Sequence, residues 1–250
     1  MPQVARDSPH WTVIIPAHNE EKTIRAIAEG ALRHASDVIV IDDGSTDSTA
    51  EALEGLPVEI IRHKLNRGKG WRLAEGLAHA AARGADGVLT LDADGQHDPD
   101  DIPAFLAAAQ AHPGALVLGD RSSDRMSIPF SRRAAIGFGD FFIGWAARRP
   151  IRDAQCGMRL YPAAVAAELD VPQCERERFV FETAILLRAA LAGKRFARVP
   201  IRARYHGFQQ RPSHFRPIVD TLEIARVVTR LLWRTRLSPS RLLIPLRAVR

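Results

Sequence analysis

Cysteine and long apolar runs are scarce in this 250-residue sequence, and their scarcity excludes several classes of protein. Two cysteines, Cys156 and Cys174, are too few for a disulfide framework or a cysteine-rich metal site, so both are expected to be reduced thiols. Residues 1–10 are polar and no apolar core follows them, so no signal peptide is expected. The longest apolar stretch, Ala134 to Ala147, is shorter than the roughly 18 residues of a membrane span and contains Asp140. We therefore predict a cytoplasmic protein.

The composition suits one large folded domain or two small ones, but the charge is unevenly distributed. Hydrophobic residues make up 46% and charged residues 26% of the chain, which excludes disordered, collagen-like and low-complexity classes. The net charge of +6 divides into −6 over residues 1–193 and +12 over residues 194–250, where only Asp220 and Glu223 oppose 14 Lys and Arg. A basic last quarter predicts contact with something anionic, and nucleic acid and an anionic membrane both qualify.

Short apolar runs alternate with helical patterns through the first 120 residues. Because the runs are almost continuously apolar, they are typical of strands that are covered on both faces. The expected strands are Trp11–Ala17, Asp37–Ile41, Val58–Ile61, Gly87–Leu91 and Ala115–Gly119. Between them apolar residues recur at helical spacing, as in Ile24, Ile27 and Ala31. The alternation predicts an α/β fold with a mostly parallel sheet covered by helices, whose ligands bind beyond the carboxyl ends of the strands.

The pattern changes after residue 120. Helices are expected over about 130–147 and 181–192, and a strand over about 196–205. From Pro217 onward, apolar residues at spacings of three and four are flanked by arginines. This basic amphipathic helix would suit a membrane surface, or it would pack on the domain.

The strongest functional signal is the segment LDADGQH at residues 91–97, directly after an expected strand. Carboxylates at positions i and i+2 beyond a strand end can face one small volume, where they repel each other unless a cation or a proton lies between them. Hard oxygen ligands favour Mg²⁺ or Mn²⁺, especially when a diphosphate supplies further oxygens. The simpler alternative is a solvated acidic turn. His97 is expected to be a solvated loop histidine, with a role beside a metal as the alternative.

Three further loops follow expected strands, and each would pass for an ordinary connection on its own. They are Pro16–Glu21 (PAHNEE), Asp42–Asp47 (DDGSTD) and Asn66–Gly70 (NRGKG). An aspartate at a strand end can accept hydrogen bonds from a ribose or a base, and Lys69 could reach a phosphate. NRGKG lacks the spacing of a Walker loop, and the chain has no GxGxxG. Their arrival in order at successive strand ends favours one common site.

Together these loops resemble those of family-two glycosyltransferases of the GT-A fold, and most closely the dolichyl- or polyprenyl-phosphate hexose synthase branch. The resemblance rests on VIIPAHNEE, VIDDGSTD, NRGKG and LTLDADGQHDP. It continues in Gly119-Asp120-Arg121, in DAQCGMR from Asp153 and in FVFE up to Glu182, over about residues 11–215. It implies a Rossmann-like GT-A catalytic domain in residues 1–215. Charge and helical spacing make residues 216–250 a basic amphipathic helical tail, a candidate for contact with a membrane surface or a partner.

The resemblance also implies an inverting, metal-dependent transfer of a hexose from a GDP- or UDP-hexose to a polyprenyl-phosphate or related lipid acceptor. The nucleotide sugar would be bound by Pro16, Ala17, Glu20, Asp43, Lys69 and Asp92. Mg²⁺ or Mn²⁺ would be held by Asp92, Asp94 and Gln96 and would offset charge on the leaving nucleoside diphosphate. Because an acceptor phosphate is already a nucleophile, positioning and electrostatics can dominate catalysis.

Guanidinium groups match a phosphate well, and the family pattern places the acceptor-binding residues accordingly. These are Arg121, Arg133, Arg211, Ser213 and His214. The expected catalytic residues are Asp94, Arg121, Arg133 and Glu182. Relatives often carry a second acid two positions after Glu182, where this chain has Ala184, which argues against a paired-carboxylate base and leaves a structural role for Glu182 open.

The sequence leaves a second acceptor class open and has features in common with two other kinds of protein. A glycan acceptor fits the same fold. A haloacid-dehalogenase-like phosphatase also has a strand followed by DxD, but it needs that motif near its first strand. A nucleic-acid-binding module would explain the high pI, but the basic tail has no reader motif or interleaved aromatics. We therefore expect no nucleic-acid partner and a peripheral location at the inner face of the membrane.

Overall fold

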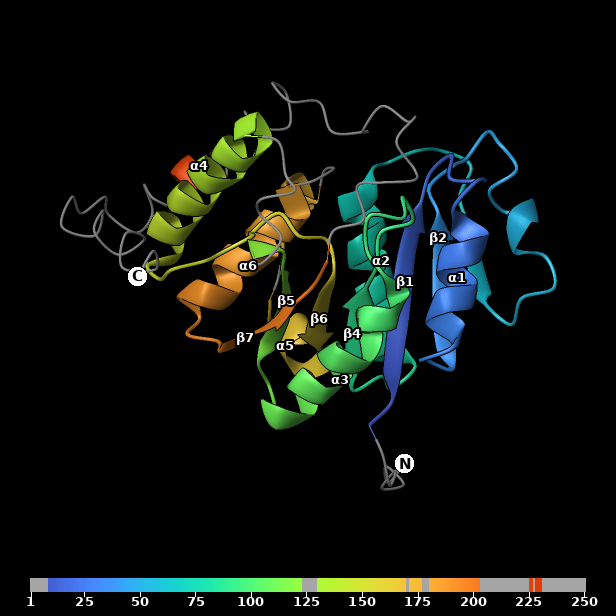
Figure 1. Cartoon of the computed structure of the whole chain (residues 1–250), viewed down its shortest axis with the longest axis horizontal. Coiled ribbons are helices and arrows are strands. Elements are labelled where there is room, and N and C mark those ends of the chain that lie inside the picture. The colour runs from blue at the N-terminus through green and yellow to red at the C-terminus, as the bar shows by residue number, and fades with distance from the viewer. Residues whose placement is uncertain are drawn as a thin grey trace.

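The computed structural model describes residues 9–122, 130–169, 171–176, 180–202, 225–226 and 228–230. Within them one sheet has the strand order β3-β2-β1-β4-β6-β5-β7 (Figure 1). Its strands are β1 (Trp11–Ala17), β2 (Asp37–Asp42), β3 (Glu59–Arg62), β4 (Gly87–Thr90), β5 (Leu116–Asp120), β6 (Arg159–Pro162) and β7 (Phe196–Pro200). All neighbouring pairs are parallel except those of β6, which runs antiparallel to β4 and β5. The expected mostly parallel α/β sheet is confirmed.

Helices cover both faces of the sheet, which is why its central strands are apolar on both sides. They are α1 (Ile24–Leu32), α2 (Lys69–Ala82), α3 (Ile102–Ala111), α4 (Phe130–Ala147), α5 (Ala163–Glu168) and α6 (Val180–Leu191). Short 3₁₀ turns lie at Glu51–Leu53, Pro99–Asp101 and Gln173–Glu175. The helices α2, α4, α5 and α6 share one core with one face of the sheet, and α1 and α3 share a second core with the other face (Figure 1).

The strand β6 was not expected from the sequence. Its four residues, RLYP, include an arginine and a proline and form no apolar run. They pair nevertheless with both β4 and β5, and Arg159, Leu160 and Tyr161 are all buried. Contacts with β4 and β5, rather than the local sequence pattern, therefore make these residues form a strand.

Close packing sets the position of α2, which begins beside the candidate site. A Cβ added at Gly76 would lie 2.7 Å from Ile14 Cδ1 and 2.8 Å from Ile41 Cδ1. The absence of a side chain at Gly76 thus lets the helix lie directly on β1 and β2. This fixes where the first residue of α2, Lys69, emerges at the carboxyl edge of the sheet.

A few residues of the predicted C-terminal tail are described. Val228 is only 4% exposed and belongs to the core that α4 and α6 share. Arg230 Nη1 lies 3.7 Å from Glu175 Oε1, whereas the side chain of Arg226 is exposed. At these positions the chain packs on the domain. In the parts of the chain that the structure describes, no helix has the length and apolar character needed to cross a membrane.

Candidate functional site

The loops after β1 and β2 are tied together at the carboxyl edge of the sheet. Asn19 adopts a left-handed backbone conformation with φ 57°, and its backbone N–H donates to Ser45 Oγ at 3.0 Å. In return, Thr46 N–H donates to Asn19 Oδ1 at 2.8 Å. The backbone N–H of Glu20 donates to Thr49 Oγ1 at 2.8 Å. The first two predicted loops are therefore one rigid unit.

Asp43 has a structural task at the same edge. Its carboxylate accepts hydrogen bonds from the backbone N–H groups of Arg67 at 2.9 Å and Gly68 at 2.7 Å. It also accepts from Arg72 Nε at 2.6 Å, and Arg72 in turn donates to the carbonyl of Leu65. Buried Asp43 thus shapes the NRGKG loop, which stays compatible with its predicted contact to a nucleotide because a carboxylate can accept further hydrogen bonds.

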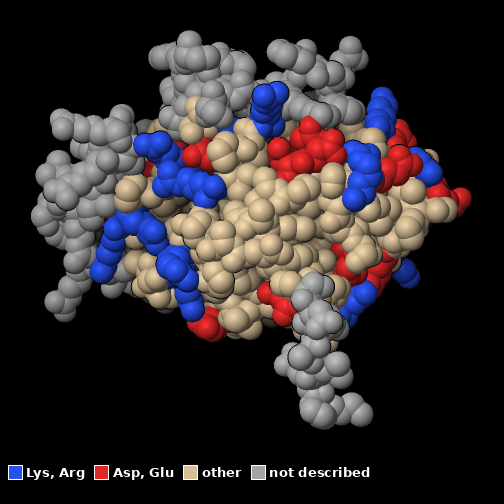
Figure 2. Space-filling model, turned by 60° about the horizontal axis from the view of Figure 1, so that its bottom comes forward, with Lys and Arg blue, Asp and Glu red and all other residues tan. Residues whose placement is uncertain are grey.

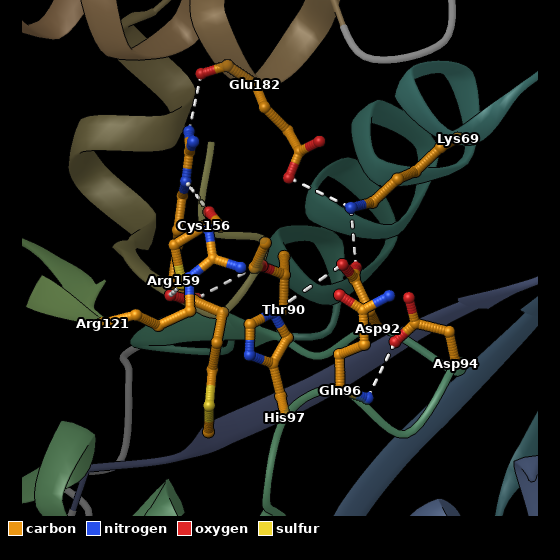
Figure 3. A network of polar contacts seen from close by, with 12 residues as sticks. Lys69, Thr90, Asp92, Asp94, Gln96, His97, Arg121, Cys156, Arg159 and Glu182 are labelled. Atoms are coloured by element: carbon orange, nitrogen blue, oxygen red, sulfur yellow. Dashed lines mark hydrogen bonds and ion pairs between the residues drawn. The ribbon is translucent and has the colours of Figure 1, made fainter. Parts of the chain in front are cut away.

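Lys69 links three elements at the centre of the site. Its ammonium lies 2.6 Å from Asp92 Oδ1, beyond β4, and 3.2 Å from Glu182 Oε1, in the first turn of α6. Figure 3 shows the side chain pointing between the two carboxylates. Burial opposes the charge on Lys69, but the carboxylates of Asp92 and Glu182 outweigh it and raise the lysine pKa above its ordinary value. Lys69 therefore remains a fixed positive charge.

The Asp92 carboxylate is held from several sides. A Cβ added at Gly157 would lie 2.3 Å from Asp92 Oδ2, so the carboxylate rests directly against that backbone. His97 Nε2 lies 3.9 Å from the same oxygen. Although burial favours the neutral acid, the charge of Lys69 opposes it and the pKa of Asp92 falls below its ordinary value. Asp92 is therefore an ionised and well-positioned carboxylate.

Asp94 differs from Asp92 in having little compensating charge. Its Oδ1 accepts a hydrogen bond from the backbone N–H of Gln96 at 3.0 Å. Burial, and after it the charge of Asp92, raises the pKa of Asp94 to about 6. The two carboxylates thus share a volume in which negative charge is in excess.

The donor set of this volume suits a hard divalent cation. Asp92 and Asp94 supply two carboxylates, and Lys69, which also contacts Glu182, supplies one ammonium. Mg²⁺ is commonly held by one or two carboxylates together with substrate phosphates, which is what Asp92 and Asp94 can offer. Among the described residues, no group of three or more His, Cys, Asp or Glu forms a metal site by itself.

Arg121 is engaged in a buried ion pair. Its Nε and Nη2 donate to the two carboxylate oxygens of Asp153 at 2.7 and 2.6 Å, and its backbone N–H donates to the same group. Although burial opposes ionisation, Arg121 lowers the pKa of Asp153. Asp153 has φ 51° and is held through backbone hydrogen bonds to Asp140 of α4. Sequence reasoning missed Asp140 and Asp153, although the DAQCGMR segment contains the latter.

Arg159 was missed as well, because a buried arginine in a short strand has no sequence signature. It is 1% exposed and donates to three carbonyl oxygens, those of Ala154, Cys156 and Glu182 (Figure 3). It therefore joins the start of β6 to the first turn of α6. Because that turn carries Glu182, Arg159 also sets the position of the carboxylate that contacts Lys69.

The structure tests the expectations for the side chains of His97 and Cys156. The expectation of a solvated His97 is wrong: its side chain is 3% exposed, and burial lowers its pKa to about 4, so it is neutral at physiological pH. The His97 ring faces the Asp92 carboxylate, with Nε2 3.9 Å from Oδ2, instead of facing the solvent. Cys156 is buried, and burial raises its thiol pKa to about 12, as expected of a small packing residue.

The structure thus brings Glu20, Asp43, Lys69, Asp92 and Asp94 to one edge of the sheet, with Pro16 and Ala17 at the end of β1. Arg121 and Glu182 reach that edge from β5 and α6. Arg133 lies in α4, and its side chain is outside the described residues. Arg211, Ser213 and His214 also lie outside them.

Gly157→Ala should disturb the site through Asp92. The new methyl group would overlap the carboxylate, so we expect Asp92 to move and any reaction that depends on its position to slow by about tenfold to a hundredfold. The matched control is Gly137→Ala in α4, where a Cβ meets nothing within 4 Å. Steady-state rates of both purified variants decide the matter, and a Gly157→Ala variant as fast as Gly137→Ala would contradict the expectation.

Comparisons with known proteins agree with the fold and with the motifs. The profile of glycosyl transferase family 2 matches residues 12–169. Undecaprenyl-phosphate mannosyltransferase of Micrococcus luteus is 30% identical over 75% of this chain and 81% of its own. UDP-N-acetylglucosamine–dolichyl-phosphate N-acetylglucosaminyltransferase of Methanococcus voltae is 29% identical over 77% of this chain and 85% of its own.

Among solved structures, the fold is similar to that of glucosyl-3-phosphoglycerate synthase from Mycobacterium tuberculosis in complex with Mn²⁺, UDP and phosphoglyceric acid. The TM-score is 0.64 with 21% identity, over 93% of this chain and 80% of that one. At this identity the likeness shows the fold alone. The sequence matches confirm the family, and the relatives that they name confirm the resemblance to the polyprenyl-phosphate branch.

Proposed function

Since the chain belongs to glycosyl transferase family 2, we propose that it moves a hexose from a nucleoside-diphosphate sugar to a polyprenyl phosphate or a related lipid acceptor. The observation that carries the proposal is the pair Asp92 and Asp94 beyond β4, beside which Lys69 bridges Asp92 to Glu182. The names of the relatives, which act on undecaprenyl or dolichyl phosphate, support the class of acceptor.

The donor would lie against the first three loops. Pro16, Ala17, Glu20 and Asp43 would contact the nucleoside, held by the cross-link that Asn19 makes between two of these loops. Asp92 and Asp94, with Gln96, would hold Mg²⁺ or Mn²⁺. When bound, the divalent cation would neutralise negative charge that develops on the leaving diphosphate. Lys69 adds a fixed positive charge beside the same group.

The reaction would be a single displacement with inversion. A phosphate oxygen of the acceptor attacks the anomeric carbon as the bond from that carbon to the diphosphate oxygen breaks. The attacking phosphate is already an anion, so no strong base is required. Glu182 would therefore position Lys69 rather than remove a proton, in keeping with their 3.2 Å contact.

Arginines would hold the acceptor phosphate, because the guanidinium group offers paired donors. Arg133 and Arg211, with Ser213 and His214, are the proposed acceptor contacts. Arg121 donates through Nε and Nη2 to Asp153, so it would act on the acceptor through the shape of its loop. The protein would work peripherally, at the inner face of the membrane.

A substrate screen tests the proposal. Purified protein with Mn²⁺ is incubated with GDP-mannose, UDP-glucose or UDP-N-acetylglucosamine and with undecaprenyl phosphate, and mass spectrometry follows the glycosylated lipid. We expect product and nucleoside diphosphate with one donor, and none with undecaprenol, which lacks the phosphate, or with excess EDTA. If the protein transferred the sugar to a glycan but to no lipid phosphate, the acceptor in the proposal would have to be a glycan instead. Phosphate release from a phosphomonoester without a sugar donor would overturn the proposal.

A further inference from the structure

Two basic segments that are distant in the sequence meet at the edge of the sheet formed by β7. Residues 148–152 (RRPIR) and 194–202 (KRFARVPIR) contain seven Lys or Arg and no Asp or Glu. Arg149 joins them: its Nη1 donates to the carbonyl of Lys194 at 2.7 Å, and its guanidinium lies 4.5 Å from the centre of the Phe196 ring. We call these two segments together the basic rim.

The charges of the basic rim are largely exposed. Arg148, Arg195, Arg198 and Arg202 are exposed, while Lys194 forms an ion pair with Glu168. Burial, and the nearby charge of Arg198, lower the pKa of Arg149, which shows that the rim brings like charges together. Figure 2 shows Lys and Arg side chains gathered on the side of the molecule where β7 and the end of α4 lie, with few acidic groups among them.

The basic rim leads to the candidate site. Strand β7 runs parallel to β5, with Asp120 opposite Pro200, and the N–H of Ile201 donates to the carbonyl of Asp120 at 3.1 Å. Arg121 follows directly and belongs to the site's polar network. Arg202 therefore lies at the same edge of the sheet as the DxD carboxylates, and Arg198 lies further down β7.

We propose that the basic rim is the surface by which this protein docks on a bilayer that contains anionic phospholipids, with the β7 edge of the sheet toward the lipid. The proposal deepens the proposed function and rests on it only for the acceptor, which the docked protein would meet in that bilayer. It places the membrane contact on the folded domain itself, separate from the C-terminal tail.

Charge and composition favour a bilayer over nucleic acid. Proteins that bind single strands stack bases on exposed aromatic rings, but Phe196, the aromatic residue of the rim, is covered by Arg149. A surface of lipid phosphates needs no such rings, because arginine binds phosphate oxygens directly. Each cation near an anionic membrane strengthens binding roughly fivefold, so several exposed arginines give substantial attraction.

The test compares two triple variants of the full chain. Arg148→Gln, Arg198→Gln and Arg202→Gln remove three charges from the basic rim and spare Arg149, which anchors it. The control variant carries Arg25→Gln in α1, Arg33→Gln directly after α1 and Arg62→Gln in β3, which together remove the same charge from the opposite side of the sheet. Binding is measured by co-sedimentation with vesicles of phosphatidylcholine, with or without one-third phosphatidylglycerol.

We expect the parent and the control variant to bind the anionic vesicles, and the rim variant to bind them at least tenfold more weakly, with little binding of any of them to phosphatidylcholine alone. Equal binding by the rim and control variants would overturn the proposal. So would rim-dependent binding to single-stranded RNA that is tighter than binding to the vesicles, because it would make nucleic acid the partner.

Transfer assays separate this proposal from the proposed function. With an acceptor phosphate short enough to dissolve in water, the rim variant should match the parent within twofold. With an acceptor embedded in anionic vesicles, its rate should fall about tenfold, and a rate equal to the parent's would count against the rim. If no nucleotide sugar supports transfer while vesicle binding still depends on the rim, the proposed function fails and the docking surface stands.

Discussion

Asp94→Asn is expected to slow hexose transfer at least about a hundredfold and, without divalent cations, to make the protein more stable at neutral pH. The loss of activity follows from removing a carboxylate that would hold the cation. The gain in stability follows from the raised pKa of Asp94, about 6 in the folded protein. An Asn side chain keeps the shape but removes the repulsion with Asp92.

The direction of the pH dependence follows from linkage between protonation and folding. Because the folded protein binds the Asp94 proton more tightly than the unfolded chain, this group favours the folded state fully below about pH 4, and the benefit is lost as the pH rises through about 6. Above that, the ionised carboxylate costs on the order of 1–3 kcal/mol. The advantage of Asp94→Asn should therefore be largest near pH 8 and shrink between pH 6 and pH 4.

His97 changes stability in the opposite direction. Its pKa of about 4 lies below the value of the unfolded chain, so its contribution is complete above about pH 6.5 and is lost as the pH falls toward 4. Because parent and variant both carry His97, subtracting their unfolding free energies isolates Asp94 to a first approximation.

Urea unfolding in EDTA at several pH values, together with a transfer assay in Mn²⁺, measures both effects. Asp100→Asn is the matched control. Asp100 lies shortly after Asp94 in the sequence, but it is an exposed acid that forms an ion pair with Arg33. It should leave transfer unchanged. An Asp94→Asn variant that retains a tenth of the parental rate, or that is less stable than the parent in EDTA at pH 8, would contradict the assignment.

Arg159→Met should cause a large loss of stability, about 3–5 kcal/mol in the free energy of unfolding. The methionine fills much of the space but leaves three buried carbonyl oxygens without their donor, those of Ala154, Cys156 and Glu182. Each buried acceptor without a partner costs roughly 1–3 kcal/mol. The first turn of α6 also loses its tie to β6.

Chemical unfolding monitored by circular dichroism measures the loss. Arg159→Lys keeps the charge but cannot reach three acceptors from one ammonium, so its stability should lie between those of the parent and the methionine variant. Arg83→Met, at an exposed arginine that pairs with Glu59 and Asp37, should change stability by less than about 1 kcal/mol. If Arg159→Met lowered the free energy of unfolding by less than about 1 kcal/mol, water or neighbouring groups would be replacing the guanidinium as donors.

The first half of the fold could be predicted because its signals are local. Continuous apolar runs such as residues 38–41 indicate a sheet that is covered on both faces, and the loops that follow such strands lie at the carboxyl edge by topology alone. The DxD pair could be found for the same reason. Both of its carboxylates, Asp92 and Asp94, lie in the loop that follows β4.

The rest depends on contacts between distant residues. Arg159 meets the carbonyl of Glu182, 23 residues away, and Lys69 meets Glu182, 113 residues away. Neither contact has a period or a spacing that a sequence pattern could carry. The expectation that His97 lies in solvent was wrong for a similar reason. Its burial depends on residues that approach it only in the folded protein, and its neighbours in the sequence do not reveal it.

The antiparallel insertion of β6 has a consequence for biosynthesis. Strands β1 to β4 are complete in the chain by Thr90, but the strand that covers the free edge of β4 begins only at Arg159. While the ribosome adds the intervening residues, a buried-type strand has no partner on that side, and unpaired edges invite association between chains. The parallel half of the sheet therefore keeps an open edge along β4 until residues 159–162 pair with it.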